Sequence, residues 1–169
     1  MTQKPKISPE SSPLENCLDS KPLNISSTSE HVEKYRISSS AQNWFGAVDC
    51  CNYHGLRLAT VNDEQDHASI NRMVEAWAGF NATGSDLWIG ASDLARGNGD
   101  HVWQATGQSV TFSKWLDNEE WDETRHCVEM NYNPDAEWHW SWKLEDCGRK
   151  LYFACELVVK VLEAELVEV

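Results

Sequence analysis

The spacing of four cysteines around a tryptophan-rich segment is the feature that most constrains the fold of this chain. Cys127 and Cys147 enclose residues 138–142, where every second residue is a tryptophan. Alternation with a period of two predicts a strand, so a cysteine on either side predicts a hairpin closed by a disulfide. A second link, between Cys51 and Cys155, would join an early helix to the last strand. Closing a loop of about 100 residues in this way removes about 4–5 kcal/mol of denatured-chain entropy.

Cysteine content and charge narrow the classes of protein to which the chain can belong. With 169 residues, nine tryptophans and 41% hydrophobic residues, it can form one domain with a sizeable core. Six cysteines favour an oxidising compartment, and the absence of a C-x2-C pair argues against a zinc site. The formal charge of −13 disfavours nucleic acid and anionic lipid as partners, since both would be repelled.

The two ends of the chain differ in composition from its centre. Residues 1–34 form a polar N-terminal arm, rich in Ser and Pro, that carries Cys17. The arm begins without the apolar segment of a signal peptide, and we expect that such a peptide has been removed from a secreted, extracellular protein. Residues 157–169 form an apolar C-terminal extension that needs burial on its own domain or on a partner. No run approaches the roughly 18 apolar residues of a membrane span.

Hydrophobic periodicity between these ends predicts an α+β domain over residues 35–156. A helix is expected from Ser40 to Tyr53, and a second from Asp63 to Ala78 with Asn62 as its N-cap. Short strands are expected at 87–90, 101–103, 127–130, 138–142 and 151–155. Helices followed by strands with long polar loops indicate the α+β class, and such loops are where binding sites usually lie.

Inside the alternating segment, Trp138, Trp140 and Trp142 are expected to face the core, as a hairpin strand packed on a core requires. His139 lies between them and is expected to point outward as a surface residue.

Several short motifs inside the domain resemble those of one family. They are Asn43-Trp44-Phe45-Gly46-Ala47 with Cys51 and Gly55, Leu87-Trp88-Ile89-Gly90, Cys127-Val128-Glu129, Trp142-x4-Cys147 and Phe153-Ala154-Cys155-Glu156. In this combination they resemble the C-type lectin-like domain, and the sequence as a whole most resembles those of secreted insect C-type lectins. The resemblance implies two helices flanking short antiparallel sheets, a long loop region, and the disulfides Cys51–Cys155 and Cys127–Cys147. In lectin members the loop region holds Ca²⁺ and a sugar.

The positions that bind Ca²⁺ and sugar in lectin members are mostly altered in this chain. Counted from Trp115, they fall on Glu119-Glu120-Trp121, Arg125 and Lys143-Leu144. Only Glu119 keeps its oxygen, whereas Ca²⁺ takes roughly six to eight oxygen ligands. A lysine or arginine about 6 Å from the ion would add repulsion on the order of 5 kcal/mol at an effective dielectric of about 20. Taken literally, the usual site for Ca²⁺ and sugar is lost.

An acidic cluster in the same loop leaves a second interpretation open. Crowded carboxylates repel one another, and a bound cation would relieve that repulsion. The candidates for a non-standard Ca²⁺ site are Glu119, Glu120, Asp122 and Asp146. The alternative is a solvated acidic loop. A sugar can stack on Trp121, or the ring can fold under its own loop; the carbohydrate-binding candidates are therefore Asn118, Glu119, Trp121 and Asp122.

Two cysteines and two asparagines have roles outside the core domain. Cys17 and Cys50 either pair with each other, which would attach the arm to the domain, or link to a second chain. Asn24 and Asn81 each begin an Asn-x-Ser/Thr triplet and are candidate glycosylation sites.

Function is expected to be recognition and not catalysis. The sequence contains no H-E-x-x-H, G-x-S-x-G or P-loop motif. By resemblance, the chain is a secreted lectin-like protein that binds carbohydrate on microbial surfaces in an innate-immune role. The alternative is a protein-interaction subunit that binds no sugar and forms a dimer with another lectin chain, through a disulfide or the apolar extension.

Overall fold

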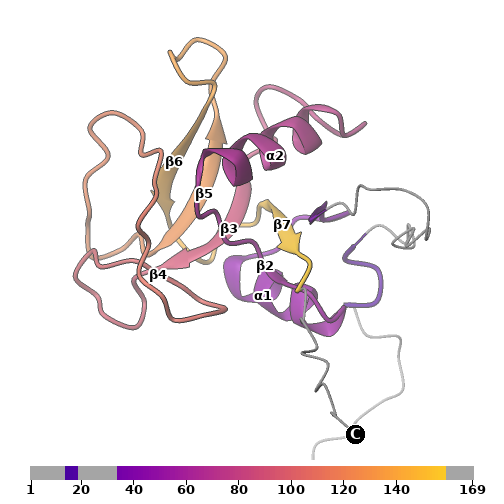
Figure 1. Ribbon diagram of the computed structural model, residues 1–169, viewed down its shortest axis with the longest axis horizontal. Coiled ribbons are helices and arrows are strands. Elements are labelled where there is room, and N and C mark those ends of the chain that lie inside the picture. Colours follow the sequence, from indigo (N-terminus) through magenta and orange to yellow (C-terminus); the bar gives the residue numbers. More distant parts are fainter. Residues whose placement is uncertain (1–13, 19–33, 159–169) are drawn as a thin grey trace, which may run out of the picture.

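The structure is a computed structural model that describes residues 14–18 and 34–158 (Figure 1). Its elements are β1 (Tyr35–Ile37), α1 (Trp44–Tyr53), β2 (Arg57–Leu58), α2 (Glu64–Glu75), β3 (Leu87–Ser92), β4 (Val102–Trp103), β5 (Cys127–Tyr132), β6 (Trp140–Glu145) and β7 (Tyr152–Glu156). Two helices with a sheet of short strands confirm the α+β class. No helix in the described part of the chain is long and apolar enough to cross a bilayer.

The strands form one mixed sheet in the order β1-β7-β3-β5-β6, with β2 paired to β7 and β4 paired to β3. Strands β3 and β7 run parallel, and the other pairs are antiparallel. The sheet therefore differs from the expected all-antiparallel arrangement at one ladder. At Gly90 a side chain has no room, because a β-carbon there would lie 2.9 Å from the carbonyl oxygen of Leu58.

Alternate side chains of the central strand β3 enter two separate cores. Leu87 and Ile89 pack with residues of α2, including Ile70 and Val74. Trp88, between them in sequence, packs instead with Trp44 and Ala47 of α1 and with the disulfides. Because successive residues of a strand point to opposite faces, one strand serves both cores and holds the two helices in place.

Both helices begin later than the periodicity predicts. Gln42 exchanges backbone hydrogen bonds of 2.9 Å with Leu151, so α1 starts only after Asn43, whose side chain accepts from the Gly46 N–H. Asp63, and not Asn62, is the N-cap of α2, and its carboxylate accepts from the Asp66 N–H at 2.8 Å. The expected helix to Ala78 ends at Glu75.

All six cysteines are paired within the chain. The disulfides are Cys51–Cys155, Cys127–Cys147 and Cys17–Cys50, with sequence separations of 104, 20 and 33 residues. The first two pairings are those that the family resemblance implies. The third shows that Cys17 and Cys50 pair with each other and not with a second chain. The arm residues Cys17 and Leu18 are buried against α1. The candidate site Asn24 and extension residues 159–169 lie outside the described residues.

Candidate functional site in the loop between strands β4 and β5

The guanidinium of Arg125 organises the loop that joins β4 to β5. Its Nη1 lies 2.9 Å from Glu119 Oε1, and its Nε contacts Asp122 Oδ2. The same group donates to the carbonyl oxygens of Glu120 (3.0 Å) and Leu144 (3.3 Å). One arginine thus binds the carboxylates of Glu119 and Asp122 and connects the loop to the end of β6.

Glu119 and Asp122 are consequently occupied by partners from the protein itself. Only 8% of the Glu119 side chain is exposed, and its Oε1 also accepts from the Leu144 N–H at 3.1 Å. Asp122 Oδ1 accepts from the hydroxyl and the N–H of Thr124. These bonds from Thr124, and then those from Arg125, lower the pKa of Asp122. Asp122 is thus held as an anion, and the carboxyl groups of both residues lie beside a fixed cation.

The four candidate Ca²⁺ ligands do not converge. Glu120 is exposed, and its backbone carbonyl meets Arg125. Asp146 accepts from the Gly148 N–H at 2.8 Å, in the turn between β6 and β7. Within residues 14–18 and 34–158, the only three His, Cys, Asp or Glu side chains with ligand atoms mutually within 4.8 Å are Cys17, Cys50 and His54. Two of these form a disulfide, so that group offers no metal site either.

Trp121 is held at the surface by a residue that sequence reasoning did not single out. Its Nε1 donates to Asp93 Oδ2 at 2.7 Å, and its ring lies against Gly99, where a β-carbon would be 3.4 Å away. Even so, 43% of Trp121 is exposed. Neighbouring Asn118 is exposed and has a positive φ of 63°. The loop therefore presents an oriented aromatic ring beside a polar turn.

Asp93 is the anchor for that ring. It is fully buried, and it also accepts from the Gly99 N–H and from His126 Nδ1, each at 2.8 Å. Burial opposes ionisation, but the hydrogen bonds from Gly99, His126 and Trp121 outweigh it and lower the pKa of Asp93. The available signal in the sequence was an acid directly after a fully buried strand, which indicates a structural role for a carboxylate.

Lys143, which the motif count assigns to another position of the family's Ca²⁺ site, is directed to an internal acid. Its Nζ lies 3.1 Å from Oε1 of Glu129, its partner across the β5–β6 ladder. Glu129 is 0% exposed, and Oε2 lies 3.7 Å from Arg149 without a hydrogen bond. Burial raises the pKa of Glu129 to about 7, against the opposing effect of Lys143.

Glu129→Gln should remove a pH dependence from stability. The pKa of Glu129 in the folded protein, about 7, exceeds its ordinary value of 4.5. The contribution of protonated Glu129 to the free energy of unfolding is therefore fully present below pH 4.5, and it is lost as pH rises through 7. The free energy of unfolding of the wild type relative to the variant should fall over this interval, by at most about 3 kcal/mol. Urea denaturation at a series of pH values measures it; a rise instead would mean that the Lys143 ion pair outweighs burial.

Residues 40–157 match the family model of the lectin C-type domain. The chain belongs to the C-type lectin domain family. Among its relatives, the salivary C-type lectin 1 of Aedes albopictus is 36% identical over 118 residues, which cover 68% of this chain and 75% of the relative. The insect-lectin resemblance inferred from the motifs is thereby confirmed.

Solved C-type lectin structures share the fold at low identity. The C-type lectin domain of murine dendritic cell inhibitory receptor 2, solved with an N-glycan, aligns with a TM-score of 0.60 and 17% identity, covering 73% of this chain and 91% of that one. A calcium-independent type II antifreeze protein aligns with a TM-score of 0.58 and 19% identity, covering 75% and 88%.

The tryptophans of this lectin domain divide between core and surface. Trp140 and Trp142 are buried as predicted, and His139 is exposed as predicted. The prediction for Trp138 is wrong, because 51% of that residue is exposed. Strand β6 begins only at Trp140, so Trp138 belongs to the turn of the β5–β6 hairpin, where the alternation of faces no longer applies.

Proposed function

We propose that this lectin-domain protein is a secreted recognition protein that binds saccharides, on microbial surfaces in an innate-immune role, without Ca²⁺ at the position usual in the family. The observation that carries the proposal is the guanidinium of Arg125, which lies between the carboxylates of Glu119 and Asp122. A divalent ion would have to displace a cation that already neutralises both acids. It would also meet Lys143, which supplies a second positive charge and no ligand.

Other features support the remaining parts of the proposal. Three disulfides suit an oxidising, extracellular compartment, and a related insect protein is named as a salivary lectin. A structural neighbour was solved with an N-glycan, and another is described as calcium-independent. On the loop, exposed Trp121 and Asn118 remain candidates for direct saccharide contact. Glu119 and Asp122 instead pair with Arg125 and hold it in place. Asn81 is exposed and remains a candidate glycosylation site.

The alternative is a protein-interaction subunit in a lectin dimer, for which Cys17 or Cys50 would have formed a disulfide between two chains. Cys17 and Cys50, the cysteines that could have linked two chains, are joined to each other. Of the apolar extension that could hold a second chain, residues 157–169, the structure describes only Leu157 and Val158. We therefore place saccharide recognition first.

A glycan array probed in Ca²⁺ and in EDTA tests the proposal. We expect the same glycans to be bound in both buffers, with intensities equal within about twofold, because no divalent ion is needed where Arg125 lies. Thermal melting in the two buffers should likewise agree within about 1 °C, since a ligand that does not bind the folded state cannot stabilise it. Loss of binding in EDTA would contradict Ca²⁺ independence, and absence of bound glycan in both buffers would contradict saccharide recognition.

A further inference from the structure

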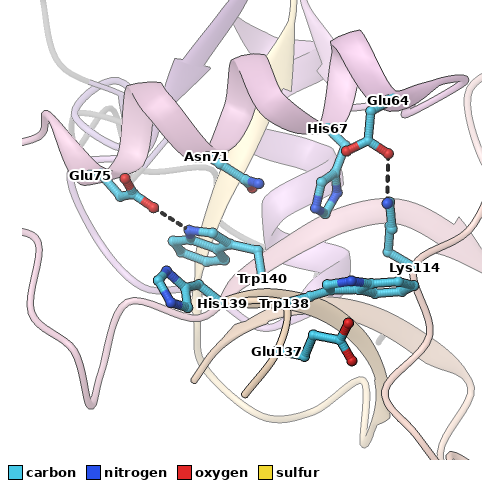
Figure 2. A pocket seen from close by; sticks show the side chains of 9 residues that line it. All are labelled: Glu64, His67, Asn71, Glu75, Lys114, Glu137, Trp138, His139 and Trp140. Atoms are coloured by element: carbon cyan, nitrogen blue, oxygen red, sulfur yellow. Dashed lines mark hydrogen bonds and ion pairs between the residues drawn. The ribbon is translucent and has the colours of Figure 1, made fainter. Parts of the chain in front are cut away.

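We infer that a cavity between α2 and the β5–β6 hairpin, which Arg125 and its acids do not line, is a binding site for a neutral saccharide. The inference rests on the proposed function and assigns it to a specific surface. The cavity has a volume of about 420 Å³, within the range of roughly 300–1,000 Å³ typical of small-ligand sites. Figure 2 shows its walls: Asn71, Glu64 and Glu75 from α2, Trp138 and Trp140 from the hairpin, and Lys114 from the β4–β5 loop.

Trp138 gives the cavity an aromatic floor. The residue is 51% exposed, and its ring lies edge-on in Figure 2, beneath Lys114 and facing the α2 side chains. The Nζ atom of Lys114 is 4.4 Å from the ring centroid and 2.6 Å from Glu64 Oε2, so the ring is kept in place by an ion-paired cation. An oriented, solvent-exposed indole beside polar groups suits the apolar face of a sugar ring.

Asn71 supplies an unsatisfied polar group at the α2 wall. Its Oδ1 is buried and has no hydrogen-bond partner among the described residues, and in Figure 2 its amide points into the cavity between His67 and Trp140. A buried acceptor without a partner is unfavourable, and a ligand hydroxyl would satisfy it. The neighbouring Trp140 Nε1 is already bound to Glu75 Oε1 at 2.7 Å, so the wall is rigid on that side.

The charges around the cavity select the class of ligand. Glu64, Glu75 and Glu137 are three carboxylates against the single ammonium of Lys114, which disfavours sulfated, phosphorylated or other anionic ligands. A cationic ligand would compete with the ammonium of Lys114, which already pairs with Glu64, whereas a neutral ring needs only the exposed part of Trp138. Neutral hydroxyl groups both donate to carboxylates and accept from an ammonium. A neutral sugar of one or two rings therefore fits best.

The cavity shares Lys114 with the β4–β5 loop, but Trp121 and Arg125 do not line it. Arg125 lies two residues before Cys127, which begins β5, whereas the cavity lies at the hairpin turn beyond Tyr132. Cys127 and Tyr132 are five residue steps apart along β5, a length of roughly 17 Å. The two exposed tryptophans, Trp121 and Trp138, can therefore be tested separately.

Isothermal titration in EDTA with neutral mono- and disaccharides of glucose, galactose, mannose and N-acetylglucosamine tests the inference. We expect Trp138→Ala and Asn71→Leu to weaken binding at least tenfold and Trp138→Phe to retain most of it. The matched control is Tyr53→Ala, which removes an exposed ring of α1 outside both sites and should bind like the wild type. Trp121→Ala reports separately on the loop site. Circular dichroism and thermal melting check that each variant is folded.

The outcomes separate the inference from the function on which it rests. If the wild type binds a saccharide and Trp138→Ala and Asn71→Leu, both folded, bind it within twofold, the cavity is not the site and the inference is overturned, while the proposed function stands. The same holds if Trp121→Ala alone loses binding. If the wild type binds none of these sugars and no glycan on the array, the proposed function fails, and the inference with it.

Discussion

Trp142→Ala should destabilise the domain by about 4 kcal/mol, a large part of the roughly 5–15 kcal/mol by which a typical single domain is stable. Trp142 is fully buried, and its ring meets those of Trp103, Phe112 and Trp115 edge-on at 5.8–5.9 Å. Its indole N–H donates to His67 Nδ1 at 3.3 Å. The substitution would therefore leave a large cavity among three aromatic rings and remove the partner of a buried histidine.

The same substitution at Trp138 is the matched control. Trp138 is half exposed and packs on Lys114, so Trp138→Ala should change the free energy of unfolding by less than about 1 kcal/mol. Urea denaturation followed by far-ultraviolet circular dichroism compares the two variants without relying on tryptophan fluorescence. Equal losses at both positions would contradict the division of these tryptophans between core and surface.

Cys51→Ala with Cys155→Ala should lower the free energy of unfolding by about 5 kcal/mol. This disulfide spans 104 residues and joins α1 to β7, so its removal restores the most chain entropy to the unfolded state of the three disulfides. Both cysteines are fully buried, which adds a packing loss. Guanidinium denaturation measures the change under non-reducing conditions.

The control removes the shorter link between Cys17 and Cys50. Because it spans 33 residues, the loop model gives about 4 kcal/mol, roughly 1 kcal/mol less than the longer link. This variant and the wild type should both run as monomers on non-reducing gels. A larger loss for the Cys17–Cys50 pair would show that docking of the arm contributes more than loop closure.

Much of the frame was predictable because it follows from periodicity and covalent links. The buried motifs around Trp44, Trp88 and Cys127 indicated one helix and two strands at the right places. Strands β1 and β2 were missed because elements of three and two residues are too short to show a period. The start of α1 was misplaced because the pairing of Gln42 with Leu151 is a contact between residues far apart in the sequence.

The candidate site was less predictable because it too depends on contacts between residues that are far apart in the sequence. The residue types at Arg125 and Lys143 indicated that Ca²⁺ ligands were missing, but not which acids these cations would contact. Arg125 reaches back to Glu119 and across to Leu144, and Trp121 reaches Asp93, which is 28 residues away. Exposure of Trp138 depended on where the hairpin turn ends, which alternation alone does not determine.

Pairing of the first strand with the last has a practical consequence for presenting the protein on a solid support. Tyr35 and Glu156 are partners across the β1–β7 ladder, at the opposite edge of the sheet from β6 (Figure 1). The two boundaries of the domain therefore lie next to each other, at Tyr35 and Glu156. A label placed at one boundary would lie beside the other and be separated from β6 by the width of the sheet.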